Sequence, residues 1–470
     1  MSKLLIPALV LVSSTGVYSA YAAEFQSGQA ARAVIGQSSF SSRDPGIAAH
    51  SLFISQGRLY AADSTDHVQT FDLGKIPGAK DELFDRPGVT CALCGFPAVA
   101  VANQSVIQGV AASATFGSTV AVADTVNHRV LIWRGVSGSQ KPDVILSRPF
   151  LDPVSVALDG KHLFVGDAGW HRVLVWNTLP SGDDTPADEV LGQPDFASAV
   201  VNDTPGAGSL RNPSALASDG LNLFVADAAD RRILVFTPGD SVLPGDAIVN
   251  SASLVSTAFA PGTLLTLQVS GLSDTSESAP ASADAPLPRE LAGVEVLLNG
   301  LPLPLLSVSP EQVQLQMPAD LGGASAGSLY VRTVHATRAV STTSALAVKF
   351  TAAFPGIFAV GANEPRSGLL LHEAGAPVSP DTPAKPGEVL TVWATGLGQV
   401  DGPDGQVLKP VSASVNNEPA EVVSATLPQG SVGVYEVRVI LPQDLGARST
   451  VQLVLVQNGN TSNTVAFPLE

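Results

Sequence analysis

The stretch Val120-Ala121-Val122-Ala123-Asp124-Thr125-Val126-Asn127-His128-Arg129-Val130-Leu131-Ile132-Trp133 decides the fold of the first half of the chain. Two apolar runs flank a short polar segment that begins at Asp124, which predicts a strand, a tight turn and a second strand. The pattern occurs four times, with an aspartate closing the first run of each copy: Asp63, Asp124, Asp167 and Asp227. The steps between these aspartates are 61, 43 and 60 residues. A period of about 40–45 residues is typical of β-propellers, whose blades are four-stranded sheets.

The repeat resembles the NHL repeat, whose name letters match Asn127, His128 and the apolar residue after Arg129. Two other segments are similar to the outer strand of such a blade: VLGQPDF from Val190 to Phe196 and AVIGQSSF from Ala33 to Phe40. The last repeat, near Asp227, has no such strand after it. We therefore expect the strand around Ile35 to complete the last blade and close the ring, which removes open sheet edges.

The number of blades stays open at this point. Four is the simplest count, although NHL propellers usually have six blades. Degenerate extra blades within residues 74–110 and 195–212, or a partial ring, are the alternatives. These two stretches otherwise read as long loops on a rigid scaffold, where recognition often takes place.

The second half of the chain carries a different repeat. The segment from Pro261 to Leu272 aligns with the segment from Pro386 to Leu397 at an offset of 125 residues. The segment from Val313 to Gly322 aligns with the segment from Val437 to Gly446 at an offset of 124. Two segments that keep nearly one offset indicate a duplicated domain, and alternating strands with turn signals predict a small β-sandwich for each copy.

Residues 248–470 resemble the Solibacter-type C-terminal domain found on secreted acidobacterial proteins. The resemblance implies a surface, adhesion or display role, and it brings no assigned activity. The segments that carry it are Val249–Ser253, Leu291–Val296, Ser309–Val313, Pro355–Phe358, Ala394–Gly398 and Val432–Val437.

These patterns predict an all-β chain: a small β-propeller of about four blades or more, followed by two tandem Ig-like β-sandwiches. The predicted boundaries are a signal peptide over 1–22, a propeller over 23–245, a first sandwich over 246–360 and a second over 361–470. Abundant Gly (43) and Pro (35) suit short strands and many turns.

The N-terminus predicts export. Lys3 gives a positive start, Leu4 to Val12 form a short apolar run, and Ala20-Tyr21-Ala22 is an A-x-A cleavage site. The apolar run is too short to span a membrane, which needs about 20 residues. We therefore expect a secreted, periplasmic or cell-surface protein without a membrane span. In such an oxidising compartment Cys91 and Cys94 are expected to form a local disulfide.

The net charge of −17 argues against nucleic acid as a partner, because nucleic acid is itself a polyanion. The expected partner is an extracellular glycan, peptide or protein.

Six repeat residues are candidates for ligand binding: Asp63, Asp124, His128, Asp167, His171 and Asp227. Each aspartate takes the same place in its repeat, which favours a structural role in which the carboxylate accepts N–H groups of its own turn. The arginine that follows is expected to direct its head group to a carboxylate.

No motif in the sequence identifies a reaction. We therefore expect a non-enzymatic binding or adhesion protein, in which propeller loops recognise the ligand and the Ig-like modules act as spacer or surface attachment. No cofactor is expected. The alternative is a propeller enzyme, such as a lactonase-like hydrolase or a lyase, with a divalent metal bound in the channel. Carboxylates or histidines that meet at one point would favour the alternative.

Overall fold

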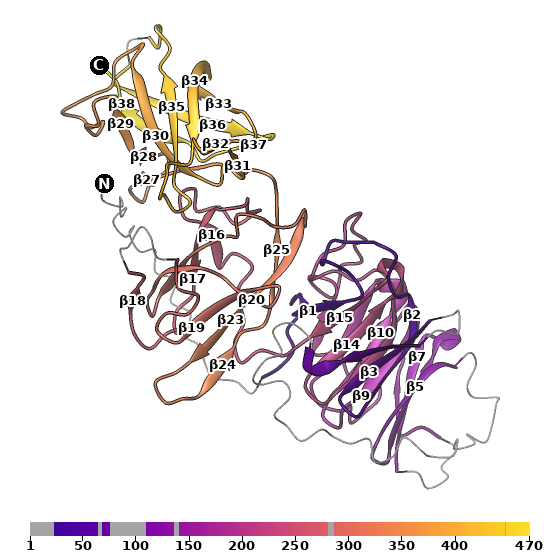
Figure 1. The fold of residues 1–470 in the computed structure, drawn as a ribbon. Coiled ribbons are helices and arrows are strands. Elements are labelled where there is room, and N and C mark those ends of the chain that lie inside the picture. The colour runs from indigo at the N-terminus through magenta and orange to yellow at the C-terminus, as the bar shows by residue number, and fades with distance from the viewer. Residues whose placement is uncertain (1–22, 64–67, 76–109, 136–140, 281–285, 447) are drawn as a thin grey trace.

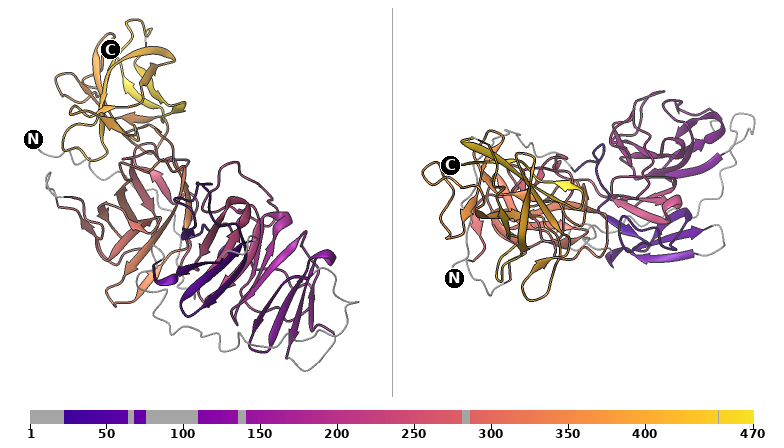
Figure 2. Two further views of the ribbon diagram at one scale, coloured as in Figure 1. Left: turned by 45° about the vertical axis from the view of Figure 1, so that its right-hand side comes forward. Right: turned by 90° about the horizontal axis from the view of Figure 1, so that it is seen from above.

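The chain folds into three bodies built from β-strands, and the expectation of an all-β chain is confirmed (Figure 1). The computed structural model describes residues 23–63, 68–75, 110–135, 141–280, 286–446 and 448–470. In Figure 1 and the left view of Figure 2, an N-terminal sheet domain, a first β-module and a second β-module follow one another. Within these residue ranges, no helix is long and apolar enough to cross a membrane.

The described residues of the sheet domain form four antiparallel sheets. Sheet β2–β4 consists of β2 (Ala49–Ser55), β3 (Arg58–Asp63) and β4 (Val68–Asp72). Sheet β5–β8 consists of β5 (Val110–Phe116), β6 (Thr119–Asp124), β7 (Arg129–Arg134) and β8 (Val144–Leu146). Sheet β9–β12 consists of β9 (Pro153–Leu158), β10 (Leu163–Asp167), β11 (Arg172–Trp176) and β12 (Glu189–Leu191). Sheet β13–β1 consists of β13 (Pro213–Ser218), β14 (Leu223–Asp227), β15 (Arg232–Phe236) and β1 (Ala33–Ile35).

The N-terminal strand β1 completes the last of these sheets. It pairs antiparallel with β15, with Ala33 opposite Val235 and Ile35 opposite Ile233. The predicted pairing of the strand around Ile35 with the last repeat is therefore confirmed. The connection from β12 to β13, residues 192–212, contains no strand, so the alternative of an extra blade within 195–212 is excluded. Most of the other stretch, 74–110, lies outside the described residues.

Buried side chains join the four sheets in series. One cluster, which includes Ala61 and Ala226, lies between sheets β2–β4 and β13–β1. A second, which includes Phe164, lies between sheets β13–β1 and β9–β12, and a third, which includes Ile132 and Trp176, joins sheet β9–β12 to sheet β5–β8. None of these clusters of described residues joins sheet β2–β4 to sheet β5–β8, so closure of a ring stays a prediction.

The first β-module is a sandwich of two sheets around one core. One sheet has the order β16 (Ile248–Asn250), β17 (Leu264–Gln268), β22 (Gln312–Gln316), β21 (Leu305–Val308), β18 (Glu277–Ser278). The other has the order β20 (Leu301–Pro302), β19 (Val294–Leu298), β23 (Ala326–Val334), β24 (Val340–Thr342), and β25 (Leu346–Lys349) also pairs with β23.

The second β-module wraps its strands nearly into a barrel around a single core. The main path is β26 (Gly356–Ile357), β30 (Val389–Thr395), β35 (Tyr435–Ile440), β34 (Glu418–Thr426), β33 (Val411–Val415), β36 (Thr450–Gln457), β38 (Val465–Pro468), β28 (Arg366–Gly368) and β27 (Ala359–Val360). Four short strands join its flanks: β29 (Leu370–His372), β31 (Val400–Asp401), β32 (Gln406–Val407) and β37 (Asn460–Thr461). The long strand β34 pairs with both β35 and β33, so it links the two layers expected of a sandwich.

The two segments that repeat in the sequence form the same strand pair in both modules. In the first, Leu264 lies opposite Gln316; in the second, Val389 lies opposite Ile440. These residues are related by the offsets of 125 and 124, so the repeat preserves the pairing register as well as the pattern.

The sheet domain is docked firmly onto the first module. The backbone N–H of Ala30 donates to the carbonyl of Ala345 at 2.9 Å. Arg32 donates to the carbonyl of Thr343 at 3.0 Å, and its guanidinium lies 4.6 Å from the ring centre of Tyr330. Tyr330 and Ala345 also belong to the buried cluster of sheets β9–β12 and β13–β1. Backbone hydrogen bonds, the contacts of Arg32 and shared buried side chains therefore all stabilise this interface.

The two modules meet at a junction of buried side chains and hydrogen bonds. Thr395 accepts from the backbone N–H of Leu264 at 2.9 Å and donates to the carbonyl of Gly433 at 2.6 Å. The buried Arg366 donates to the carbonyl of Ala252 at 2.9 Å. The Leu264–Thr395 and Arg366–Ala252 bonds cross between the modules in buried surroundings, so they hold the angle between the modules.

His372 in the second module gives the stability a pH dependence. A hydrogen bond to Glu388 raises the pKa of His372 above its usual 6.5, and the carbonyl of Thr382 accepts from the other ring nitrogen at 3.1 Å. The stabilisation is complete below the unfolded-state pKa and is lost as the pH rises through the folded-state pKa. Because both side chains of the pair still contact solvent, we expect a contribution of about 0.2–1 kcal/mol to the free energy of unfolding.

We therefore expect His372→Gln to lower the urea midpoint of the wild type at about pH 6 and to change it little at about pH 9. His50→Gln, on the exposed part of β2, is the matched control and should leave the difference between the two pH values as in the wild type. If His372→Gln lowers the urea midpoint by the same amount at both pH values, the His372–Glu388 pair is not the source of the pH dependence.

Candidate functional site

Three of the sequence repeats share one hairpin geometry. A strand ends in aspartate, a three-residue 3-10 helix follows, the next residue is left-handed, and an arginine begins the second strand. The 3-10 helices are η2 (Thr125–Asn127), η3 (Ala168–Trp170) and η4 (Ala228–Asp230). The left-handed residues have φ of 52° at His128, 54° at His171 and 51° at Arg231. The backbone N–H of each donates to the carbonyl three residues earlier, which closes the turn.

The aspartates of these hairpins are fully buried, and two of them accept N–H groups from outside their own turn. Oδ1 of Asp167 accepts from the backbone of Leu151 at 3.1 Å and of Asp152 at 2.8 Å. Oδ1 of Asp227 accepts in the same way from Arg211 and Asn212, at 3.1 and 2.8 Å. The expectation that the carboxylate accepts N–H groups of its own turn is therefore wrong for these two. Each aspartate instead holds the connection that leads into the first strand of its sheet.

The arginine that follows each aspartate completes an ion pair, as expected. The N···O distances are 2.7 Å for Arg129 and Asp124, 3.5 Å for Arg172 and Asp167, and 3.1 Å for Arg232 and Asp227. Burial is the largest influence on the pKa of both Asp167 and Asp227 and raises it, while their arginines and backbone donors act in the opposite direction.

The buried arginines also pin the connections between sheets. Arg172 donates to the carbonyls of Pro149 and Phe196, both at 2.7 Å. Arg232 donates to the carbonyls of Phe40 at 2.8 Å and Ser209 at 2.7 Å. Two side chains therefore fix the backbones of three inter-sheet connections, all at the end of the sheets where the aspartates lie.

The other sequence candidates are spread over separate sheets. Asp63 ends β3, is half-buried and lies opposite Ala49. His128 hydrogen-bonds through Nδ1 to the carbonyl of Leu151, and His171 does so to the carbonyl of Arg211 at 2.6 Å. Within the described ranges, no three His, Cys, Asp or Glu side chains are grouped to hold a metal ion. Cys91 and Cys94 lie outside the described residues, as does the predicted signal peptide.

Exposed apolar side chains gather at this same end of the sheets. We call five of them the loop-end patch: Val126, Leu151, Trp170, Phe196 and Val200. Four are strongly exposed, at 60% for Val126, 49% for Leu151, 41% for Phe196 and 53% for Val200, and Trp170 is half-buried. Side chains of this kind on ordered loops are typical of interaction sites.

Contacts along the connections tie together the backbones that carry Leu151, Trp170, Phe196 and Val200. The side chain of Leu151 lies over Gly169, where an added Cβ would come within 2.7 Å of it. The next residue, Trp170, has its ring centre 5.0 Å from the Arg172 guanidinium, which also binds the carbonyl of Phe196. Gln193 then donates to the carbonyl of Val200 at 3.0 Å and accepts from its backbone N–H at 2.9 Å.

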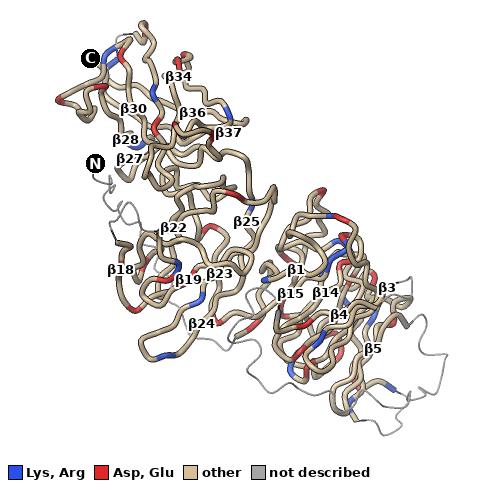
Figure 3. The backbone as a smooth tube through the Cα atoms, in the orientation of Figure 1, with Lys and Arg blue, Asp and Glu red and all other residues tan. Residues whose placement is uncertain are grey.

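The sequence pointed to the connection 195–212 as a recognition loop but missed the patch. Leu151 and Trp170 lie at turns beside the repeat residues, and their exposure depends on contacts between different sheets. The sequence signal that could have identified these exposed residues was an apolar residue within an otherwise polar turn. Lys and Arg are scattered over the three bodies among many uncharged residues (Figure 3).

Comparisons with known proteins leave the family open. No family model and no curated protein matches the sequence. Among solved structures, the chain is similar to the computationally designed Ika8 protein at 13% identity and a TM-score of 0.19, covering 40% of this chain and 45% of that one. A Bacteroides ovatus mixed-linkage glucan utilization locus protein, SGBP-B in complex with a mixed-linkage heptasaccharide, matches at 13% identity and a TM-score of 0.21 over 45% of this chain and 43% of that one.

Fibronectin(III)-like modules of Clostridium thermocellum CbhA match at 13% identity and a TM-score of 0.15, covering 47% of this chain and 92% of theirs. The chain spans less than half the length of the designed protein and of the glucan-locus protein.

Proposed function

We propose that the chain is an exported, non-enzymatic binding or adhesion protein. In this proposal the sheet domain is a small NHL-type propeller of four or more blades that recognises an extracellular glycan, peptide or protein. The two Ig-like modules form a Solibacter-type unit that acts as a spacer or surface attachment. The N-terminal signal pattern supports export.

One observation carries the proposal: the loop-end patch is apolar, exposed and held on backbone that buried arginines fix in place. A preorganised surface binds more tightly because little conformational entropy is lost on contact. A few anchor residues supply most of the binding energy at protein interfaces, and tryptophan, here Trp170, is enriched among them.

The arrangement of the three bodies supports the spacer role. The sheet domain and the second module lie at opposite ends of the molecule in Figure 1, and both junctions between bodies are built from buried side chains and hydrogen bonds. If the second module attaches the protein to a surface, the first module holds the sheet domain, which carries the loop-end patch, away from that surface.

The test is binding of the mature protein, residues 23–470, to a glycan and peptidoglycan array and to extracellular proteins. We expect the double variant Leu151→Ser, Phe196→Ser to weaken capture of any ligand found by at least about tenfold, because two exposed anchors are removed. Leu301→Ser is the matched control, since Leu301 is 66% exposed on the first module and is not part of the loop-end patch.

Capture that is unchanged in the double variant, or lost equally in Leu301→Ser, contradicts a role for the patch. Silence on all arrays together with metal-dependent turnover of a lactone contradicts the proposed function itself.

A further inference from the structure

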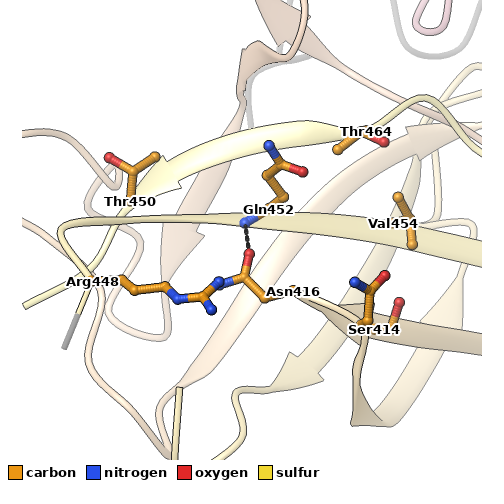
Figure 4. A pocket seen from close by; sticks show the side chains of 8 residues that line it. Ser414, Asn416, Arg448, Thr450, Gln452, Val454 and Thr464 are labelled. Atoms are coloured by element: carbon orange, nitrogen blue, oxygen red, sulfur yellow. Dashed lines mark hydrogen bonds between the residues drawn. The ribbon is translucent and has the colours of Figure 1, made fainter. Parts of the chain in front are cut away.

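The second module carries a polar groove that the proposed function does not use. It lies on the outer face of β33 and β36, has a volume of about 400 Å³, and its lining includes Ser414, Asn416, Arg448, Thr450, Gln452 and Thr464 (Figure 4). Figure 4 shows the Arg448 side chain extending along the groove toward Asn416. The groove is thus formed by residues that are separated in sequence and brought together by the pairing of β33 with β36.

The side chains that line the groove offer many hydrogen-bond donors. Oδ1 of Asn416 accepts from the backbone N–H of Gln452 at 2.9 Å, which fixes the side chain of Asn416 beside the groove. Arg448 adds a guanidinium with five N–H donors. The hydroxyl groups of Ser414 and Thr450 and the amide of Gln452 add further donors along the lining.

The charge of the groove contrasts with that of the chain. The whole chain has a net charge of −17, whereas the described residues lining the groove include one arginine and neither Asp nor Glu. The apolar part of the lining is small, with Val454 as its aliphatic member. These properties select a small, oxygen-rich and anionic ligand and disfavour an apolar one.

We infer that this groove binds an acidic saccharide, with a sugar carboxylate on Arg448 and sugar hydroxyls on the amide and hydroxyl side chains. A carboxylate forms two parallel bonds with a guanidinium, which supplies both strength and orientation. Hydroxyl groups can donate and accept, as Ser414, Thr450 and Gln452 can, so adjacent sugar hydroxyls satisfy both types of group. The site is independent of the loop-end patch, which lies on a different body.

Isothermal titration calorimetry of residues 23–470 with tetragalacturonate tests this inference. We expect saturable binding that Arg448→Gln weakens by at least about tenfold, because one charge-assisted pair is lost. Arg338→Gln is the matched control: Arg338 is exposed in the turn between β23 and β24 of the first module, so its replacement should leave binding unchanged. A neutral cello-oligosaccharide of the same length should bind at least about tenfold more weakly.

Ser414→Tyr provides a second variant, because a tyrosine ring would occupy the groove, and it should abolish binding. The double variant Leu151→Ser, Phe196→Ser should bind tetragalacturonate as the wild type does, so failure of the groove and failure of the loop-end patch are distinguishable. Three results would each overturn the inference. The wild type does not bind tetragalacturonate, Arg448→Gln binds it as tightly as the wild type does, or the neutral oligosaccharide binds as tightly as tetragalacturonate.

Discussion

Replacing Arg232 with methionine is expected to destabilise the sheet domain by about 3–5 kcal/mol. Arg232 is fully buried and pairs with the equally buried Asp227, so its removal leaves a carboxylate without its counter-charge. The carbonyls of Phe40 and Ser209 also lose the hydrogen bonds that Arg232 donates to them. Urea denaturation followed by tryptophan fluorescence measures the change, and the connections that Arg232 holds should become susceptible to limited proteolysis.

Arg231→Met is the matched control for this prediction. Arg231 is the preceding residue and is exposed, so its replacement should change stability by no more than about 0.5 kcal/mol. The double variant Arg232→Met, Asp227→Asn should recover part of the loss, because an amide oxygen can still accept the N–H groups of Arg211 and Asn212 without a buried charge. Equal stability of Arg232→Met and Arg231→Met would show that the ion pair does not support the domain.

Replacing Gly396 with alanine is expected to open the junction between the modules. Gly396 has φ of +79°, and an added Cβ would lie 2.2 Å from the carbonyl oxygen of Phe354. The left-handed backbone alone costs an alanine about 1–2 kcal/mol. Overpacking against a backbone atom adds about 1–3 kcal/mol. Because the carbonyl of Gly396 also accepts from the N–H of Phe354 at 2.8 Å, relief of the clash requires the loss of that bond.

Gly375→Ala isolates the contribution of the backbone conformation. Gly375 has φ of +84° with no atom within 4 Å of an added Cβ, so only the left-handed cost applies. Hydrogen exchange should therefore accelerate in β26 and β30 of Gly396→Ala and not of Gly375→Ala. Small-angle scattering should show a broader distribution of distances for Gly396→Ala only. The same loss of stability in both variants would refute a steric lock at the junction.

The sequence was informative wherever one residue type at one spacing determines a local structure. The aspartate hairpins could be predicted because a strand, a polar turn and an arginine follow one another within about fifteen residues. The pairing of β1 with β15 could be predicted because the last repeat lacked a strand that the N-terminus supplies. The offsets of the second repeat anticipated a pairing register that both modules share.

The sequence was uninformative where contacts depend on backbone groups far along the chain. The carbonyls bound by Arg172 and Arg232 carry no side-chain signature, so the role of these arginines in holding three connections was missed. The partners of Asp167 and Asp227 were wrongly assigned for the same reason. The groove on the second module depends on the adjacency of β33 and β36, which no local pattern encodes.

The pairing of β1 with β15 determines when the last sheet can form during synthesis. Ile35 leaves the ribosome about 200 residues before Ile233, its neighbour in the sheet. Throughout that interval β1 has no partner strand, while the hairpins of the three preceding sheets can form as they are synthesised. The sheet domain is therefore completed late, by its oldest segment, and a nascent chain halted before Phe236 would present an unpaired N-terminal strand to chaperones.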